Sequence, residues 1–441
     1  MAIAITSETQ KALGDNARNC ASRSLFKDRF ANPQAKDDER KQWFSTLLQK
    51  SAEKIARSPW LPATSAQLHA RLMSRLLVDL SGGVMENANV NLDRYGLPLI
   101  PGSAVKGCAR RMALQALHDW IEAGTHRPAP DDACAPCCEG FPNPATMLAA
   151  IARIFGWTPN DWSDSPDKSD FAWTTGGDKA LLNTARALNP AHETFAGTIA
   201  FLAASPNRDP GLELDVVTPH HTEYYKGNPA YSTAPDTEDP VPVFFPAVKA
   251  QGENDYFTFP LIPLRLAAEG DLTHAKRWLA HGLELFGLGA KTNAGYGWFD
   301  ASDSLQRVVQ VKQDAARKAE AERKQQEAEK ARQTAEQEAA RQKREQESAA
   351  TAGMSEDEKA DYQVAQLSDA QFEHKVKSFF KEPKKGGPSE TEKKAIVRAL
   401  RGSRLAFWHE FKAKAAKGGD LAKSEQAIRT LNKSLSGDKM P

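Results

Sequence analysis

The stretch that decides the fold is Leu288-Gly289-Ala290-Lys291-Thr292-Asn293-Ala294-Gly295-Tyr296-Gly297-Trp298-Phe299. Its glycines, spaced G-x5-G-x-G, lie between a predicted amphipathic helix over residues 272–286 and a predicted short strand over residues 296–299. Glycine permits backbone conformations and close approaches that a Cβ would block. Main-chain N–H groups and Lys291 can then meet a phosphate chain, although a turn after a helix C-terminus explains the glycines equally well.

This glycine loop is not one of the common nucleotide-binding loops. The sequence has no G-x4-G-K-[ST] motif, and the loop does not follow a first strand as a dinucleotide-binding loop does.

The elements before the loop complete a mixed pattern of helices and strands. Hydrophobic spacing predicts helices over residues 37–56 and 103–123, the second with Ser103 as its N-cap. Strand patterns occupy residues 67–80, 197–202, 212–217, 243–248 and 256–264. The order strand, helix, strands, helix, glycine loop, strand predicts an α+β fold with a ferredoxin-like core and long insertions.

Changes in composition divide the chain into four parts. We expect an N-terminal helical segment at residues 1–66, a core at 67–300, a charged helical linker at 301–350 and a helical domain at 351–441. Within the core, residues 124–192 form a predicted insertion that is rich in Pro, Asp and Gly and holds short helices, one of them over residues 145–155. Residues 312–347 consist almost wholly of Lys, Arg, Glu, Gln and Ala, without an apolar heptad seam, which predicts a solvated helix rather than a coiled coil.

Composition and charge argue against a membrane-spanning protein, a secreted protein and a protein with a broad basic face. The 441 residues include 40% hydrophobic and 26% charged residues, and no run approaches the ~20 apolar residues that cross a bilayer. We expect a cytoplasmic protein with no signal peptide, and five cysteines agree with a reducing compartment. Residues 1–300 carry 29 Lys and Arg against 34 Asp and Glu, whereas residues 351–441 carry 18 against 13. Any RNA contact in the first 300 residues should therefore be local.

Two further motifs give the glycine loop a context. Ile100-Pro101-Gly102-Ser103-Ala104-Val105-Lys106-Gly107 places a rigid turn before a basic helix start, and Leu214-Asp215-Val216-Val217-Thr218-Pro219-His220-His221 follows about a hundred residues later. With the glycine loop, in this order over about residues 70–300, they resemble the RAMP superfamily of CRISPR RNA-binding proteins. The Asp-x-x-Thr-Pro-His element is similar to that of the sixth-subunit family of type III-B (Cmr) effector complexes. Nothing after Phe299 takes part in the resemblance.

The resemblance implies a non-catalytic RNA-binding scaffold without cofactor, metal or membrane. Its implied partners are the CRISPR guide RNA near its 3′ end, neighbouring Cmr/RAMP subunits and, indirectly, target RNA. In the helix-opening motif, Ser103, Lys106, Arg110 and Arg111 could place a hydroxyl group and cations beside phosphate at a helix start. The plain alternative is a capped helix with a solvated basic face. The expected RNA-binding residues are Ser103, Lys106, Arg110, Gly289, Lys291, Thr292, Asn293, Gly295 and Gly297.

Other candidate residues favour structural roles. His220 or His221 could act as a general acid or base, but adjacent strand residues face opposite ways, and a structural histidine hydrogen-bonded near Asp215 or Tyr224 is favoured. Resemblance also places target cutting on the repeated backbone subunit of such complexes. Cys134-x-x-Cys137-Cys138 with a distant His126 is a weak zinc signal because no second pair occurs, so reduced thiols are favoured. The aromatic residues that we expect in the core rather than stacked on bases are Phe244, Phe245, Tyr256, Phe257 and Phe259.

Two rival functions follow from the same sequence. One is an endoribonuclease that uses His220 or His221. The other is a protein-binding adaptor that acts through the charged helix and the basic tail after Asp300. A proline-rich loop over residues 226–242, with Tyr224, Tyr225 and Tyr231, is the predicted projecting element that touches a neighbour or the guide–target duplex.

Overall fold

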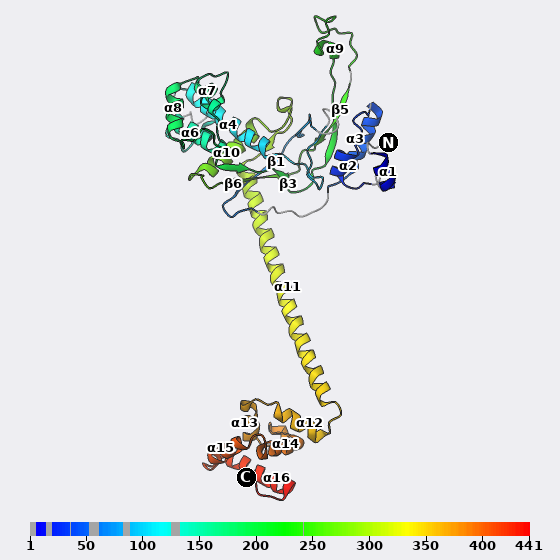
Figure 1. The fold of residues 1–441 in the computed structure, drawn as a ribbon, viewed down its shortest axis with the longest axis vertical. Coiled ribbons are helices and arrows are strands. Elements are labelled where there is room, and N and C mark those ends of the chain that lie inside the picture. Colours follow the sequence, from blue (N-terminus) through cyan, green and yellow to red (C-terminus); the bar gives the residue numbers. More distant parts are fainter. Residues whose placement is uncertain are drawn as a thin grey trace. The chain divides into compact units, whose positions relative to one another are not determined.

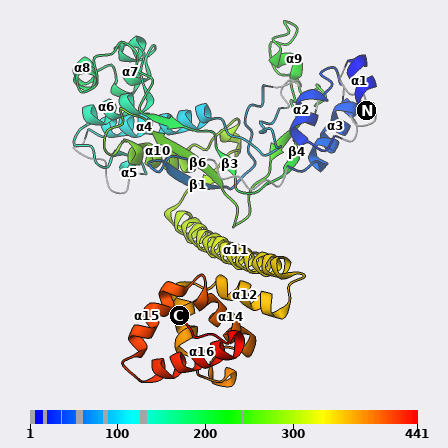
Figure 2. The same cartoon turned by 60° about the horizontal axis from the view of Figure 1, so that its bottom comes forward.

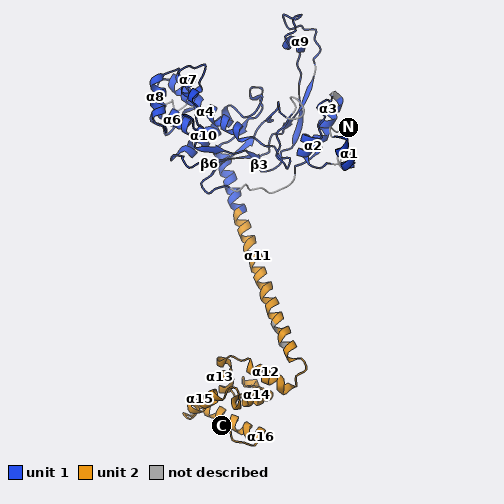
Figure 3. Cartoon of the chain, in the orientation of Figure 1, with its two compact units in different colours: residues 1–316 blue, residues 317–441 orange. Residues whose placement is uncertain are grey.

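The computed structural model describes residues 6–14, 20–35, 37–52, 61–82, 89–124, 133–240 and 242–441. The chain forms two compact units, residues 1–316 and residues 317–441, which are coloured separately in Figure 3. Both helices and antiparallel sheets are present, so the predicted α+β class is confirmed. No helix in the described ranges is long and apolar enough to cross a bilayer.

A five-stranded antiparallel sheet organises the first unit (Figure 1). Its strand order is β2-β6-β1-β7, and the short β3 also pairs with β6. Strand β6 lies at the centre because it pairs with both β2 and β1, with Leu261 opposite Phe201 on one side and Ala66 on the other. The strands are β1 (Ala66–Leu72), β2 (Ile199–Phe201), β3 (Ser205–Pro206), β6 (Phe257–Pro263) and β7 (Phe299–Asp300).

Two long helices cover this sheet. Helix α4 (Gly102–Glu122) packs against α10 (Asp271–Leu285), and α10 packs on β1 and β6. The buried residues of α10 recur at helical spacing, with Ala275, Leu279 and Leu283 each four residues apart, so one face of the helix is buried in the core. Trp278 on the same face donates its indole N–H to the Cys137 carbonyl oxygen at 2.9 Å, which ties α10 to the predicted insertion.

The insertion forms short helices as predicted. They are α5 (Ala135–Cys138), α6 (Pro144–Phe155), the 3-10 helix η2 (Pro159–Trp162), α7 (Asp170–Thr175) and α8 (Lys179–Ala187). Asn143 starts α6 by accepting a hydrogen bond from the main-chain N–H of Thr146, while the Thr146 hydroxyl lies 3.4 Å from the Asn143 N–H. The insertion packs on α4, away from the ribbon described next (Figures 1 and 2).

A two-stranded antiparallel ribbon leaves the core at the other end of the sheet. Strand β4 (Leu212–Val217) pairs with β5 (Val243–Val248) along its whole length, from Leu212 opposite Val248 to Val217 opposite Val243. The chain between them contains the single-turn helix α9 (Thr222–Tyr225), and Figures 1 and 2 show this segment projecting from the unit. The projecting element predicted from the proline-rich loop is confirmed as a shape.

The N-terminal helices belong to the same hydrophobic core as the sheet. They are α1 (Ser7–Leu13), α2 (Arg23–Arg29) and α3 (Asp37–Gln49). Phe26, Phe44 and Leu47 are fully buried in that core. The buried Arg23 guanidinium donates two hydrogen bonds to the Asp209 carboxylate, at 2.8 and 3.0 Å, and so joins α2 to the segment before the ribbon.

Helix α11 (Asp303–Thr351) confirms the helix predicted over residues 312–347 and extends it at both ends. Leu305 and Val309 are buried in the first unit, whereas nearly every described residue of α11 after Lys312 is exposed. Ion pairs four residues apart, such as Glu320–Lys324 at 2.8 Å, support the exposed part by a few tenths of a kcal/mol each.

Residues 352–441 contain helices and no strand, and all of them are described. They form their own core, in which Phe372, Ile396 and Trp408 are fully buried. Reciprocal Ser caps start α12, α13 and α14, which places each helix start where the sequence has a Ser. The helices are α12 (Glu356–Ala365), α13 (Asp369–Lys377), η4 (Pro383–Lys385), α14 (Glu390–Arg401), α15 (Leu405–Ala415) and α16 (Asp420–Ser436).

Four boundaries differ from the sequence predictions. Helix α3 ends at Gln49, and residues 53–56 of the predicted helix lie outside the described residues. Strand β1 ends at Leu72, because the chain then turns to bond with the glycine loop and the ribbon. The predicted strand over residues 296–299 is mostly loop, and β7 begins only at Phe299. Ser103 is not the N-cap of α4, since Pro101 occupies that position and makes no side-chain cap bond.

Candidate nucleic-acid interface

The glycine loop is fixed to the segment that follows β1. Main-chain hydrogen bonds run from Ala290 N–H to the Leu77 oxygen at 2.8 Å and from Gly297 N–H to the Arg75 oxygen at 2.7 Å. A third closes the loop on itself, from Leu288 N–H to the Gly297 oxygen at 2.8 Å. Because these bonds use main-chain groups at both ends, the loop has a defined shape without help from its side chains.

The glycines of the loop have different physical roles. Gly289 (φ 104°) and Gly297 (φ 69°) both lack room for a Cβ, which would overlap the carbonyl oxygen of Leu77 or of Leu288. Gly295 also has a left-handed backbone (φ 91°), but nothing lies within 4 Å of the position of its missing Cβ. Close packing therefore requires the first and third glycines, whereas only the conformation requires the second.

A cleft lies between the glycine loop and the start of α4. Its walls are residues 78–81 after β1, residues 286–290 with Thr292 from the loop, and the α4 residues Ala104, Gly107, Cys108 and Arg111. Gly107 leaves the α4 wall open, since a Cβ there would meet no atom within 4 Å. The cleft thus brings together two of the three motifs singled out in the sequence, the helix-opening motif and the glycine loop.

Arg111 supplies the positive charge of this cleft. Its side chain is exposed, and the guanidinium carbon lies 4.4 Å from the centre of the Phe286 ring. A guanidinium held against a ring still presents its N–H groups to a phosphate or a base. Asp79 on the opposite wall accepts a hydrogen bond from the Asn89 amide at 2.8 Å. Among the described lining residues, the cleft therefore has one cation and one carboxylate rather than a broad basic face.

Cys108 in the wall of the cleft is not a nucleophile. It is buried, its thiol lies 3.7 Å from the Gly287 carbonyl oxygen, and burial raises the pKa of the thiol to about 12. The thiol therefore stays protonated near neutral pH.

Lys106 and Arg110 lie on a different side of α4. Arg110 forms ion pairs with Asp170 and, at 3.4 Å, with Asp161, both in the insertion. The pKa of Lys106 is lowered by burial first and by the charge of Arg110 second, which places these two cations near each other. Residues four apart lie on the same face of a helix, so Lys106 shares one face of α4 with Arg110, and Gly107 shares another with Arg111. The structure therefore joins Arg110 to the insertion, and the cleft has Arg111 instead.

Lys291 lies on the ribbon side of the glycine loop. Its side chain is exposed, its backbone is left-handed (φ 58°), and its ammonium lies 4.8 Å from the centre of the Phe245 ring on β5. Tyr296, also on that side, donates its hydroxyl to the Asp215 carboxylate at 2.5 Å. Arg75 bonds to the same carboxylate at 2.8 Å, so the base of the ribbon is fixed to the loop.

These contacts set the ionisation of Asp215. Burial favours its neutral form, but hydrogen bonds from Tyr296 and the Val216 main chain, together with the charge of Arg75, lower the pKa of Asp215 overall. Burial first and the Asp215 hydrogen bond second raise the pKa of Tyr296. This network gives Asp215 a structural role, in which it joins the ribbon to Tyr296 and Arg75.

The nine predicted RNA-binding residues therefore fall into three places. Gly289 and Thr292 line the cleft, and Ser103 is exposed in the first turn of α4. Arg110 pairs with the insertion, and Lys106 lies near Arg110. Lys291, Asn293 and Gly295 belong to the exposed part of the loop, whereas Gly297 is buried and packs against Leu288. Arg111 belongs to the same group of cations at the start of α4 but was left out of these nine, and only the pairing of Arg110 with the insertion shows that Arg111 is the arginine of the cleft.

The adjacent histidines follow β4 rather than lying on it, since the strand ends at Val217. His221 places its Nδ1 3.0 Å from the Pro235 carbonyl oxygen, and the two imidazole rings are 6.5 Å apart. For His221 the expected bond near Asp215 or Tyr224 was wrong, because the chain folds back and brings the Pro235 carbonyl oxygen to its ring. The bond spans the two sides of the projecting segment.

The cysteines and aromatic residues are structural where the chain is described. Cys134, Cys137 and Cys138 are buried, and the Cys134 thiol lies 3.2 Å from the Asp119 carboxylate. The described residues contain no group of three metal-binding side chains, and His126 lies outside them. Phe245, Phe257 and Phe259 are buried, which confirms the core assignment for these three, whereas Phe244 and Tyr256 are half-buried.

A match to a family model gives the class of protein to which this fold belongs. The model of the RAMP superfamily matches residues 56–300, which is more than half of the chain, so the chain belongs to the RAMP superfamily. The resemblance seen in the sequence motifs is thereby confirmed. The matched range includes all the residues that line the cleft.

One curated relative within this superfamily is similar to the chain over about half of its length. The chain is similar to the CRISPR system Cmr subunit Cmr6 of Pyrococcus furiosus, with 27% identity over 253 residues. The alignment covers 52% of this chain and 65% of the relative, which is less than two thirds of the relative's length.

Two solved structures are also similar. A chain of a type III-B Cmr-beta complex bound to cognate target RNA is 17% identical, with a TM-score of 0.32, over 68% of this chain and 75% of that one. The crystal structure of Cmr6 from Pyrococcus furiosus is 22% identical, with a TM-score of 0.27, over 55% of this chain and 100% of that one.

Proposed function

We propose that this chain is an RNA-binding structural subunit of a type III-B CRISPR effector complex, which contacts the guide RNA near its 3′ end and neighbouring RAMP subunits. The observation that carries the proposal is the cleft in which Arg111 faces the fixed glycine loop. One cation, an open helix face at Gly107 and the main chain of residues 287–290 suit a phosphate of an RNA backbone better than a small-molecule substrate.

The topology supports a ferredoxin-like core for this role. In chain order the elements are β1, α4, β2, β6, α10 and β7, and the sheet places the four strands in the order second, third, first, fourth. This is the order of a split βαβ unit, whose antiparallel sheet with helices on one face is a common RNA-binding platform. The insertion and the ribbon are then additions to that unit, and the C-terminal helices are an extension of it.

The modest charge of the cleft supports a role within an assembly. The first 300 residues are acidic in sum, and Arg110 is held by the insertion rather than exposed to a ligand. Binding by the isolated chain should therefore be weak and sensitive to salt. Neighbouring subunits would add contacts to the same RNA, and target RNA would be met indirectly.

The proposal includes no catalytic role for this chain. His221 holds the Pro235 carbonyl oxygen, and Cys108 is a protonated thiol, so neither is poised as a nucleophile or a paired acid and base. An assay of RNA cleavage by the isolated chain, with metal and with chelator, tests this. Robust cutting that is lost in His220→Ala or His221→Ala would establish the endoribonuclease alternative instead.

A tagged pull-down from the native host tests membership of the complex. Bound RNA is sequenced and bound proteins are identified from the same sample. We expect short RNAs from a CRISPR array together with other RAMP subunits. Heterogeneous RNA, or no such partners, would contradict the proposal. Repeating the pull-down with the chain truncated after Asp300 tests the adaptor alternative, since loss of the partners would assign assembly to the C-terminal extension.

A further inference from the structure

The charges of the C-terminal unit are separated along its sequence. Residues 374–419 contain thirteen Lys or Arg and four Asp or Glu, whereas residues 351–373 contain one Lys and six Asp or Glu. The acidic residues therefore gather at α12 and α13, and the basic residues run from the end of α13 to the end of α15. A helical bundle needs no such separation for its stability.

The fold brings lysines from different helices around two adjacent phenylalanines. The ammonium groups of Lys381 and Lys423 lie 5.9 and 5.5 Å from the centre of the Phe380 ring. Lys393 of α14 lies 5.8 Å from the Phe379 ring and donates a hydrogen bond to the Lys381 carbonyl oxygen at 3.1 Å. Phe379 is buried in the core, whereas Phe380 is half-buried and reaches the surface.

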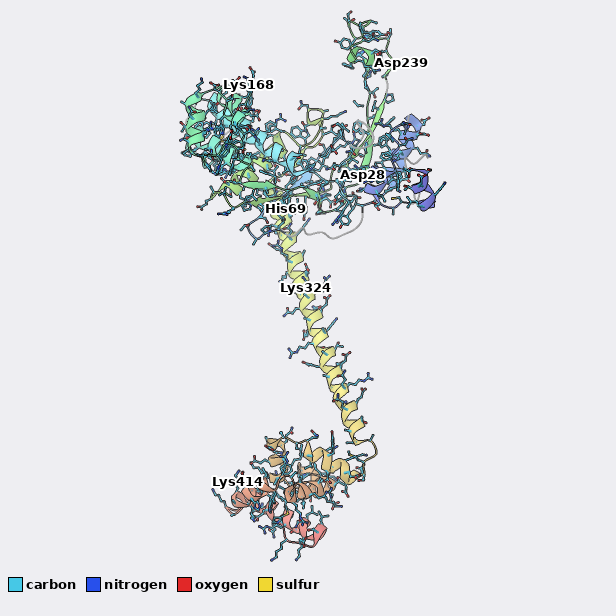
Figure 4. All side chains as sticks on the ribbon, viewed as in Figure 1. Asp28, His69, Lys168, Asp239, Lys324 and Lys414 are labelled. Carbon is cyan, nitrogen blue, oxygen red and sulfur yellow. The ribbon has the colours of Figure 1, made fainter. Side chains whose placement is uncertain are left out.

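Two more lysines extend this group over the end of α13. Lys377 forms an ion pair with Glu373 at 2.8 Å, and its carbonyl oxygen accepts a hydrogen bond from the Ser424 hydroxyl of α16 at 2.8 Å. The Lys377 hydrogen bond first, and the charge of Lys414 more weakly, lower the pKa of Glu373, so Lys414 of α15 is close to the same carboxylate. Figure 4 labels Lys414 in the helical unit. We call Lys377, Lys381, Lys393, Lys414 and Lys423 the lysine cluster.

The ion pairs within the lysine cluster leave its charge available. Those of Lys377 with Glu373 and of Lys423 with Asp420 are exposed and join residues three or four apart on one helix. Such pairs contribute about 0.3–0.5 kcal/mol and are easily exchanged for a phosphate. Within residues 352–441, all of which are described, Lys381, Lys393 and Lys414 form no ion pair.

We propose that the lysine cluster is a second RNA-binding surface, which holds the phosphate backbone of single-stranded RNA while Phe380 offers a face to a base. The charges come from four helices and from Lys381 in the loop after α13, and a spread of this kind suits an extended polyanion rather than a small anion. A half-buried aromatic ring among cations favours nucleic acid over an acidic protein, because bases stack on such rings. The surface belongs to a unit with its own core and is separate in the chain from the cleft.

The test uses the full-length chain and a fluorescent single-stranded RNA of about 16 nucleotides, and it measures affinity against salt concentration. Lys381→Glu/Lys414→Glu/Lys423→Glu removes the surface. Lys359→Glu/Lys433→Glu/Lys439→Glu makes the same change of charge elsewhere in the unit. We expect the first variant to lose at least about tenfold in affinity and about 2 in the slope of log affinity against log salt, since each phosphate contact on a single strand contributes about 0.7.

The decrease in log affinity of the control variant should be at most about a third of the decrease in the first variant. Thermal melting should show that both variants are folded. Equal losses in the two variants, or no loss in either, would overturn the proposal. Unchanged RNA affinity with loss of a co-purifying acidic protein would overturn it in favour of a protein partner. Failure of the cleft to bind RNA would appear separately, as an absent effect of Arg111→Ala in the same assay.

Discussion

The side-chain amide of Gln306 brackets the main chain of His69. Its oxygen accepts the His69 N–H at 3.0 Å, and its NH2 group donates to the His69 carbonyl oxygen. Strand β7 pairs with β1 only at Arg71 and Leu72. At His69 the hydrogen bonds that a longer β7 would make are made instead by the side chain of Gln306, in the first turn of α11. A side chain thus ties the start of the long helix to the edge of the sheet.

Replacement of Gln306 should destabilise the first unit. Gln306→Ala removes the hydrogen-bond partners of the partly buried His69 N–H and carbonyl oxygen. The free energy of unfolding should therefore fall by about 1–3 kcal/mol. Chemical denaturation measures the change. Gln310→Ala removes only an exposed hydrogen bond to Asp314 within α11 and serves as the control. Equal effects of the two substitutions would show that the bracket contributes nothing.

The His69 imidazole makes the stability depend on pH. Burial first, and the charge of Lys276 second, lower the pKa of His69 to about 4, and its ring nitrogens lie 3.2 Å from the Thr258 hydroxyl and the Gln313 amide. The folded state therefore binds fewer protons than the unfolded chain. The stability due to neutral His69 is complete above the unfolded pKa of about 6.5 and is lost as pH falls toward 4, by at most about 3 kcal/mol.

The measurement compares unfolding free energies at several pH values between neutral and about pH 4 for the native chain and His69→Gln. Burial is also the main cause that lowers the pKa of His274 and His281. The native chain and His69→Gln should therefore both lose some stability in acid. The difference between the two chains isolates His69. A pH-independent difference would contradict the assignment.

The glycines of the loop should differ in their tolerance of alanine. Gly297→Ala forces a Cβ into the Leu288 carbonyl oxygen and should destabilise the first unit by about 2–4 kcal/mol. Gly295→Ala meets open space and should cost about 1 kcal/mol, the penalty of the left-handed backbone alone. Thermal melting of the two variants checks the order, and a larger loss in Gly295→Ala would refute the packing argument.

The projecting segment should matter for assembly rather than for folding. Tyr225 at its single-turn helix is 71% exposed, and Tyr224 and Tyr231 are exposed as well, so few core contacts depend on them. Replacing residues 220–240 with a short Gly-Ser linker between β4 and β5 should leave the melting temperature nearly unchanged. It should weaken recovery of partner subunits or target RNA in the pull-down. Unchanged recovery would remove the ribbon from the proposed interface.

Local patterns predicted most elements, because each depends on nearby residues. Helices α4, α6 and α10 and strands β4, β5 and β6 lie within a few residues of their predicted ranges. What the sequence did not show was partnership between distant segments. Arg110 and Arg111 are neighbours of the same type, and only the packing of Asp161 and Asp170 against α4 separates an arginine of the insertion from one of the cleft. The pairings of Gln306 with His69 and of Pro235 with His221 are equally invisible to a local pattern.

The most direct test of the RNA-binding role is the salt dependence of single-stranded RNA affinity for the native chain, Arg111→Ala and Arg186→Ala. Arg186 is a matched control because it is also exposed over an aromatic ring, at 6.0 Å from Trp162, but outside the cleft. If Arg111 holds a phosphate, Arg111→Ala should weaken binding several-fold and lower the log–log salt slope by about 0.7, while Arg186→Ala leaves both unchanged. Identical behaviour of the two variants would contradict the assignment of the cleft as the RNA site.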